Sequence, residues 1–368
     1  MKSYDLPPYP YDRLNDLRAV AVERHGTAVD MSIGAPFDPP PQAVIDALST
    51  SGLERGYPSS IGIAPFREAA RDWLSSQFGA EVDAMTHIGA TVGLKEFVAN
   101  APHLLRLRNP DKDTVLFPAV SYPSYAMGAD LAHGRAVPVP LDDDWNMRLD
   151  AIDPDDIDRA AMLWVNSPGN PTGAIADLEE AAEWGRTHGV PVISDECYIE
   201  FTWDGPPDTI VNYGTEGVLA VHSLSKRSNL AGVRAGFYAG DEELVHWFQE
   251  IRKHTGMMIP GPAQHAAAVA LGDQEHVEVQ KATYQERLAL MIEFLGKVGI
   301  TAPMPGGGFY LWAHAPEGAW NLAQRLAEEV GLIVSPGEFY GEDGEDYVRV
   351  AVVQSNEAIA NLSHRLAS

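Results

Sequence analysis

The sequence predicts an α/β fold with a mostly parallel sheet covered by helices on both faces, together with a smaller α+β unit. Strand-length apolar runs alternate with helical patterns through the middle of the chain, which indicates successive βαβ units. These runs cover residues 114–117, 161–165, 190–194, 218–222 and 233–239. Near the C-terminus the order changes to helix, glycine-rich turn, helix and strand, which predicts the separate small unit.

Two segments show the helical pattern of the large unit clearly. Residues 65–78 place apolar side chains at helical spacing behind Pro65, a residue suited to a first helical turn. Residues 177–188 open with acidic residues, which favour a helix N-terminus, and keep apolar residues on one face.

In the C-terminal part the patterns predict helices and one strand, at residues 280–297, 321–330 and 347–353. We therefore predict three parts. Residues 1–40 form an N-terminal arm that joins the small domain, residues 41–279 form the large domain, and residues 280–368 complete the small domain.

Composition is that of a soluble globular protein, with 45% apolar and 21% charged residues among 368. No run of about 18 apolar residues predicts a membrane span, and residues 1–14 lack the apolar stretch of a secretory signal. The only cysteine, Cys197, cannot form an intrachain disulfide, which fits a reducing compartment. We expect a cytoplasmic protein.

Acidic residues outnumber basic ones by 52 to 26, and the formal charge is −26. Such a charge repels nucleic acids and anionic membranes, so we expect neither as a partner. An anionic ligand must then be bound by cations placed locally for that purpose.

The segment SLSKRSNLAGVRAG at residues 223–236 contains the most informative group of side chains. Lys226 lies between the hydroxyls of Ser223 and Ser225, with Arg234 eight residues further on. A lysine in this setting can form a Schiff base with an aldehyde cofactor, and its neighbours can hold an anionic group such as a phosphate. Taken alone, the same pattern also fits a lysine in a serine-rich turn.

Two further motifs follow predicted strands, where ligands bind in parallel sheets. NSPGNPTG at 166–173 makes a rigid turn that presents the Asn170 amide, although such pairs also occur in plain turns. In SDECY at 194–198, a buried Asp195 calls for a cation such as a protonated heterocyclic nitrogen, and Tyr198 could donate to the same ligand. A helix-capping aspartate is the alternative.

Arg349 lies in the otherwise apolar strand YVRVA at 347–351. A buried guanidinium needs an anion, and the anion is either a substrate carboxylate or an internal acid. Residues 89–96 read as a glycine-containing turn that opens a helix, which is a natural anion site. The chain has no GxGxxG, no HExxH and no cysteine pair, so we expect no metal.

Together, NSPGNPTG, SDECY, SLSKRSNLAGVRAG and YVRVA resemble the class I/II aminotransferases of pyridoxal phosphate (PLP) fold type I, over residues 32–349. The resemblance implies a seven-stranded sheet in the large domain and a homodimer. It implies that Lys226 carries PLP and moves the substrate proton, while Asp195 keeps the cofactor nitrogen protonated. Asn170 and Tyr198 would bind the phenolic oxygen of PLP, and Tyr122 would stack on its ring.

The resemblance also implies a phosphate site and a substrate site. The phosphate ligands would be Ser223, Arg234 and the backbone groups of Gly93, Leu94 and Lys95, with Tyr57 reaching across from the neighbouring subunit. Leu94 departs from the family, which often has a small or hydroxyl residue there, and Thr91 is a candidate replacement. Arg349, with Gly34 and Asn170, would bind the substrate α-carboxylate.

Within the family, the lysine segment and residues 252–260 and 336–341 are similar to actinobacterial N-succinyldiaminopimelate aminotransferases. These enzymes exchange an amino group between N-succinyl-LL-2,6-diaminopimelate and 2-oxoglutarate in lysine biosynthesis. Both substrates are dicarboxylates, so a second cation is expected, with Arg227, Arg252 and Lys253 as unassigned candidates. The alternatives are another class I/II specificity (aspartate, aromatic or methionine), a PLP-dependent C–S lyase, and a non-catalytic binding protein with the same fold.

Overall fold

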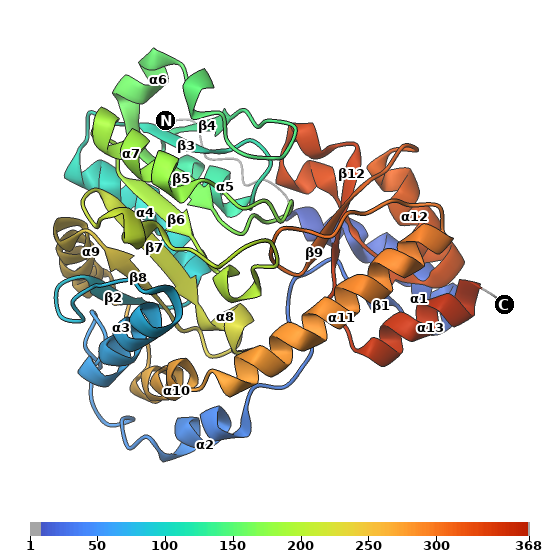
Figure 1. Cartoon of the computed structure of the whole chain (residues 1–368), viewed down its shortest axis with the longest axis horizontal. Helices are drawn as coiled ribbons and strands as arrows, with labels where there is room; N and C mark the ends of the chain where they lie inside the picture. The colour runs from blue at the N-terminus through green and yellow to red at the C-terminus, as the bar shows by residue number, and fades with distance from the viewer. Residues whose placement is uncertain (1–8, 367–368) are drawn as a thin grey trace. The chain divides into compact units, whose positions relative to one another are not determined.

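The computed structural model describes residues 9–366 and divides the chain into two compact units (Figure 1). The large unit comprises residues 38–283 and 305–308, and the remainder of the chain forms the small unit. These limits differ by a few residues from the predicted boundaries at 40 and 280. The short segment 305–308, which belongs to the large unit, was not predicted to do so.

The large unit is built on a seven-stranded sheet with the order β2-β8-β7-β6-β5-β3-β4. β8 runs antiparallel to both of its neighbours, and the other pairings are parallel. The sheet therefore confirms the predicted mostly parallel arrangement. Its strands are β2 (Ile88–Thr91), β3 (Thr114–Pro118), β4 (Arg135–Val139), β5 (Ala160–Asn166), β6 (Val192–Asp195), β7 (Val218–Ser223) and β8 (Gly236–Gly240).

Two of these strands were not predicted. Gly89 lies inside β2 rather than in a turn, because it pairs with Tyr238 of β8, whose hydroxyl would be 2.4 Å from a Cβ at this position. In the sequence, a glycine that is required by close packing cannot be distinguished from a glycine that is required by a turn. β4 is a half-exposed edge strand that contains Pro138, so it lacks the apolar run of a buried strand.

Helices cover both faces of the sheet, as expected for a doubly covered parallel sheet. Successive residues of β6 and β7 point to opposite faces: Val192 and Val218 belong to one hydrophobic core, and Ile193 and Leu219 to the other. The first core includes residues of α2 (Gln42–Thr50), α3 (Ala64–Phe78), α7 (Leu178–His188) and α10 (Gly261–Gly272). The second includes residues of α4 (Leu94–Arg108), α5 (Ser124–Leu131) and α9 (Glu242–Thr255).

The small unit combines the two ends of the chain. β1 (Val29–Asp30) pairs with β10 (Leu332–Ile333), and a three-stranded antiparallel sheet has the order β11-β12-β9. Its other elements are η1 (Pro10–Leu14), α1 (Asn15–His25), β9 (Tyr310–His314), α12 (Ala319–Val330), β11 (Ser335–Pro336), η5 (Gly337–Tyr340), η6 (Glu342–Gly344), β12 (Tyr347–Ala351) and α13 (Asn356–Leu366).

The long helix α11 (Glu275–Lys297) begins in the large unit and ends in the small one. It starts five residues before the helix predicted from residue 280. Across residues 9–366, no helix is both long enough and apolar enough to cross a membrane.

Candidate active site

The predicted site residues of the large unit meet at the carboxyl edge of its sheet. The neighbouring strands β5 and β6 end at Asn166 and Asp195, which are register partners. β7 ends at Ser223, which pairs with Gly236 of β8, and Gly236 in turn pairs with Thr91 at the end of β2. Segments far apart in the sequence are thus brought together by strand register.

Asp195 is a buried carboxylate at the centre of this edge, with 6% of its surface exposed. Its Oδ2 accepts a hydrogen bond from the Tyr125 hydroxyl at 2.9 Å, and its Oδ1 accepts one from the Cys197 backbone N–H at 3.2 Å. Burial raises the pKa of Asp195, while these hydrogen bonds and the positive charge of Lys226 oppose the rise. A carboxylate in this environment is stabilised by a cation placed against it.

Tyr125 is a site residue that the sequence analysis did not identify. Its ring stacks on Trp164 of β5 at 5.0 Å, which fixes the hydroxyl that donates to Asp195. Tyr122, three residues earlier, packs edge-on against Tyr125 at 5.8 Å. A tyrosine one helical turn after an expected cofactor-stacking residue is the only signal that the sequence offers for this role.

The NSPGNPTG turn is held rigidly against the end of β6. The Asn166 side-chain amide donates to the Asp195 carbonyl at 2.8 Å, and its Oδ1 accepts from the Asn170 backbone N–H at 2.8 Å. Asn170 and Tyr198 are both buried, at 6% exposure each. Tyr198 directly precedes the short helix η3 (Ile199–Phe201).

Lys226 lies on α8 (Leu224–Arg227), a single helical turn that directly follows β7. Ser223 caps this turn, since its hydroxyl accepts from the Ser225 backbone N–H at 3.1 Å. Lys226 is half-buried, and its charge acts on Asp195. The lysine and the aspartate predicted to act on one cofactor therefore interact electrostatically.

Gly93 and Arg234 form a cradle for an anion. Gly93 has φ +67° and caps α4, and a Cβ on it would lie 2.1 Å from a guanidinium nitrogen of Arg234. Only glycine allows the guanidinium to approach the N-terminus of a 15-residue helix this closely. Backbone N–H groups and a guanidinium together suit a phosphate.

The other residues predicted to bind the phosphate differ in how exposed their side chains are. The Leu94 side chain is 5% exposed and packs in the hydrophobic core, so only its backbone could face the anion. Lys95 is exposed, whereas Thr91 is fully buried. Tyr57 is 98% exposed and contributes nothing to the cradle of its own chain.

These residues fit PLP. The Gly93–Arg234 cradle offers donors to a phosphate, buried Asp195 offers a partner to a protonated ring nitrogen, and Lys226 offers an amine to an aldehyde. No cluster of three or more metal-ligating side chains lies within residues 9–366.

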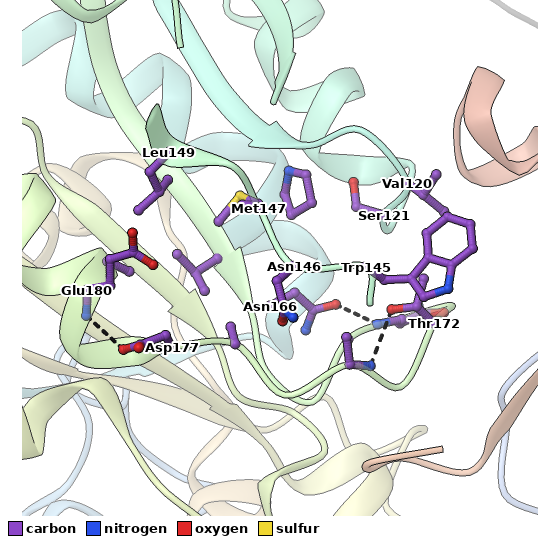
Figure 2. Close-up of a pocket in the computed structure, with 17 residues that line it drawn as sticks. Val120, Ser121, Trp145, Asn146, Met147, Leu149, Asn166, Thr172, Asp177 and Glu180 are labelled. Atoms are coloured by element: carbon purple, nitrogen blue, oxygen red, sulfur yellow. Dashed lines mark hydrogen bonds between the residues drawn. The ribbon is translucent and has the colours of Figure 1, made fainter. Parts of the chain in front are cut away.

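A cavity lies behind the NSPGNPTG turn (Figure 2), with Asn166, Thr172 and Trp145 among its lining residues. Its volume is about 60 Å³, and because a water molecule needs ~10–15 Å³ it has room for a few waters only. Asn170 lines it, whereas Lys226, Asp195 and Arg234 do not. The cavity therefore reaches only one of these four predicted cofactor residues.

In the small unit, Arg349 is held between two aromatic rings. Its guanidinium carbon lies 4.2 Å from the ring centre of Tyr310 and 4.7 Å from that of Tyr340, and one nitrogen donates to the Ser32 carbonyl at 2.6 Å. A Cβ on Gly34 would lie 2.0 Å from the Tyr310 hydroxyl. Arg349 and Gly34, both predicted to bind substrate, are thus brought together through Tyr310.

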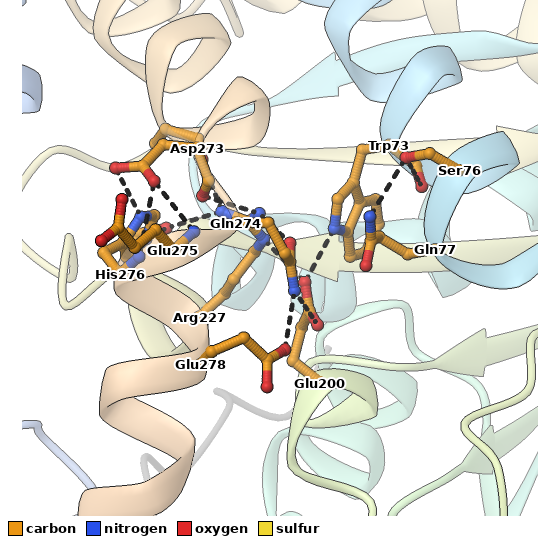
Figure 3. A network of polar contacts seen from close by, with 12 residues as sticks. Trp73, Ser76, Gln77, Glu200, Arg227, Asp273, Gln274, Glu275, His276 and Glu278 are labelled. Carbon is orange, nitrogen blue, oxygen red and sulfur yellow. Dashed lines mark hydrogen bonds and ion pairs between the residues drawn. The ribbon is translucent and has the colours of Figure 1, made fainter.

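Two of the three candidates for a second substrate cation are engaged elsewhere. Arg227 is 3% exposed and pairs with Glu200 (Figure 3), and Arg252 is 1% exposed and pairs with Glu96 at 3.0 Å. Lys253 is half-exposed and pairs with Glu250. The arginines are structural ion pairs of the large unit, so the cation that would bind a distal carboxylate stays unassigned.

Comparison with known proteins was consistent with this geometry. Residues 27–366 match the model of the family described as aminotransferase class I and II. The chain is 38% identical to 4-dedimethylamino-4-oxo-anhydrotetracycline transaminase of Streptomyces rimosus, over 98% of this chain and 99% of the relative. It is 33% identical to LL-diaminopimelate aminotransferase of Aquifex aeolicus, over 98% and 96% of the two chains.

Among solved structures, a probable N-succinyldiaminopimelate aminotransferase from Thermus thermophilus superposes with a TM-score of 0.88 and 30% identity. The match covers 98% of this chain and all of the other.

Proposed function

The chain belongs to the class I and II aminotransferases, a PLP-dependent family that acts on amino acids and 2-oxo acids, and we propose that it transfers an amino group between N-succinyl-LL-2,6-diaminopimelate and 2-oxoglutarate. The observation that carries the catalytic part is the position of buried Asp195 and Lys226 at the ends of the neighbouring strands β6 and β7, together with the Gly93–Arg234 cradle. We place the reaction in lysine biosynthesis and in the cytoplasm.

When bound, PLP supplies an electron sink that makes the α-proton of an amino acid acidic. Lys226 Nζ would take that proton from the α-carbon and deliver it to the cofactor C4′ in the same half-reaction, and would move a proton in the reverse direction in the other half-reaction. Asp195 would keep the ring nitrogen protonated, and Tyr125 and Cys197 hold Asp195 in place. Asn170 and Tyr198 would bind the phenolic oxygen, and Tyr122 would stack on the ring.

The phosphate is assigned to Ser223, Arg234 and the N-terminus of α4, through Gly93, Leu94 and Lys95. Arg349, together with Gly34 of the same unit, is assigned to the substrate α-carboxylate. Tyr57 belongs to the phosphate site of the partner subunit in a homodimer. Its 98% exposure leaves the side chain available for that contact.

Two comparisons support a diaminopimelate-type substrate. The Thermus thermophilus structure is described as a probable N-succinyldiaminopimelate aminotransferase, and the Aquifex aeolicus relative as an LL-diaminopimelate aminotransferase. Because the Aquifex aeolicus relative is named for LL-diaminopimelate, free LL-diaminopimelate is the other candidate substrate. The two differ in charge, because succinylation removes an ammonium group and adds a carboxylate.

The test follows the visible absorbance of the PLP-loaded enzyme during addition of single substrates. Glutamate and N-succinyl-LL-2,6-diaminopimelate should each deplete the band, and 2-oxoglutarate should restore it. Depletion by free LL-diaminopimelate but not by its succinyl derivative would replace the proposed substrate. Release of pyruvate and ammonia from a sulfur amino acid, with the band retained in the absence of any 2-oxo acid, would instead indicate a lyase.

A further inference from the structure

A buried ion pair lies directly beside the lysine segment of the large unit (Figure 3). Arg227 Nε and Glu200 Oε1 are 3.0 Å apart, and the two side chains are 4% and 7% exposed. The Trp73 indole N–H donates to the same Glu200 oxygen at 2.7 Å, and the Arg227 guanidinium carbon lies 5.6 Å from the Trp73 ring centre. Gln274 donates to the other Glu200 oxygen at 3.0 Å.

Both members of this ion pair lie close in sequence to residues assigned to the cofactor. Arg227 immediately follows Lys226, and Glu200 is two residues after Tyr198. We propose that the Arg227–Glu200 pair is a positioning device that fixes the Lys226 segment relative to the Tyr198 segment. This inference rests on the proposed function, in which both Lys226 and Tyr198 act on PLP.

α8 needs such an anchor because it is only four residues long. A single helical turn is not stable by itself and must be held by tertiary contacts. Arg227 supplies them by donating to the Ala270 carbonyl at 2.6 Å and to Gln274 Oε1 at 2.9 Å, at the end of α10. The planar guanidinium bonds in fixed directions, so it sets the orientation of α8 as well as its location.

Burying the two charged side chains costs desolvation free energy, a cost that packed neutral side chains would not have. Burial lowers the pKa of Arg227, and the charge and hydrogen bond of Glu200, together with the charge of Asp273, oppose this effect. Replacing a buried ion pair by neutral groups of similar volume is often neutral for stability. The pair is therefore better explained by the geometry it imposes than by stability.

The chain offers a matched control in Arg67. This arginine of α3 is also buried, at 5% exposure, and donates to the Gly62, Ala84 and Met85 carbonyls at 3.1–3.2 Å. Like Arg227, it donates hydrogen bonds to backbone carbonyls, but none of these contacts involves the Lys226 or Tyr198 segment. Arg67→Met should lower stability and leave the cofactor geometry unchanged.

The experiment compares the double variant Glu200→Gln/Arg227→Met with Arg67→Met. Both are loaded with PLP and assayed by the exchange of isotopic label between 2-oxoglutarate and glutamate, because this pair gives no net reaction. Neutralising both partners keeps the local net charge, so a change reports lost geometry. Since a misplacement of ~1 Å can cost about 100-fold, we expect kcat of the double variant to fall by up to that factor, with KM nearly unchanged. Visible circular dichroism, which reports the orientation of bound PLP, should change in parallel.

Four outcomes decide the inference. Wild-type kcat and dichroism in the double variant would overturn it, and so would an equal loss of kcat in Arg67→Met. If the double variant does not fold, Arg227→Lys keeps the charge but loses the directed bonds, and it must show the same dichroism change. Wild-type protein that gives no visible band with PLP would overturn the proposed function together with this inference, whereas a normal wild-type band isolates the inference.

Discussion

Lys226 of the large unit and Arg349 of the small unit are the two cations assigned to the reaction. Different interactions hold each of them in place. Lys226 lies on one helical turn at a polar sheet edge, where it interacts with a buried carboxylate. Arg349 lies in a strand between the Tyr310 and Tyr340 rings, with the Ser32 carbonyl as acceptor. A proton-transferring amine needs neighbours that respond to its charge. A carboxylate-binding guanidinium must stay charged, and aromatic faces attract a cation without neutralising it.

The largest effect should follow from Lys226→Ala, which removes the only amine at the sheet edge assigned to PLP chemistry. Loss of a positioned acid–base and nucleophilic group should lower kcat by about 10⁴-fold or more. The rate of label exchange between 2-oxoglutarate and glutamate measures it. Lys253→Ala, at a half-exposed lysine paired with Glu250, is the control and should keep wild-type kcat.

Arg349→Lys should have the next largest effect, because it keeps the charge but loses the planar fork and its stacking between rings. We expect kcat/KM for glutamate to fall by about 100-fold, while the dissociation constant of PLP is unchanged. Steady-state kinetics and a PLP titration separate these two quantities. Arg325→Lys, at an arginine of the small unit paired with Glu317, should change neither. Equal loss of PLP affinity in Arg349→Lys would contradict the substrate role.

A smaller effect is expected from Tyr125→Phe, which removes the 2.9 Å hydrogen bond to Asp195. A hydrogen bond to a charged group contributes about 1.5–3 kcal/mol, and we expect a loss near the lower end of this range, which lowers kcat by roughly tenfold. Tyr213→Phe is the matched control, since it breaks a 2.6 Å bond to another carboxylate, that of Asp208. If both variants lost the same activity, the role given to Tyr125 would be wrong.

The smallest effect on activity should come from Glu196→Gln, whose consequence is for stability. Burial raises the pKa of Glu196 to about 8 and lowers that of its neighbour His222 to about 3, so both are neutral at pH 7. The folded state keeps a proton that unfolded Glu196 loses above its ordinary pKa. Its contribution to stability is complete below that pKa and declines by about 1.4 kcal/mol per pH unit until pH 8.

Glutamine does not titrate, so the advantage of Glu196→Gln over wild type should grow as the pH rises toward 8 and then level off. Urea unfolding at several pH values measures it. Glu216→Gln, at an exposed glutamate, should show no such trend. A constant difference at all pH values would mean that Glu196 is ionised in the folded protein.

The sequence predicted the parts of the fold that have a strong period or a strong motif. Apolar runs identified the central strands β5 to β7, and three of the four motifs indicated residues that the register then brought to one edge. It missed β2, because Gly89 is required by the Tyr238 ring rather than by a turn. It also missed β4, whose half-exposed edge carries no continuous apolar run.

The partners of buried polar groups were not predicted from the sequence. Arg227 and Arg252 read as possible substrate cations, but each is paired with a glutamate distant in sequence, Glu200 and Glu96. Tyr125 contacts Asp195 across 70 residues. Such pairs depend on side-chain contacts between elements, which periodicity and composition do not encode.

The most direct test of the account identifies the lysine that binds PLP. The loaded enzyme is reduced with borohydride, digested, and its seven lysines are examined by peptide mass spectrometry. The account predicts a pyridoxyl group on Lys226 in wild type and on no lysine in Lys226→Ala. Modification of Lys95 or any other lysine in place of Lys226, or of none in wild type, would contradict it.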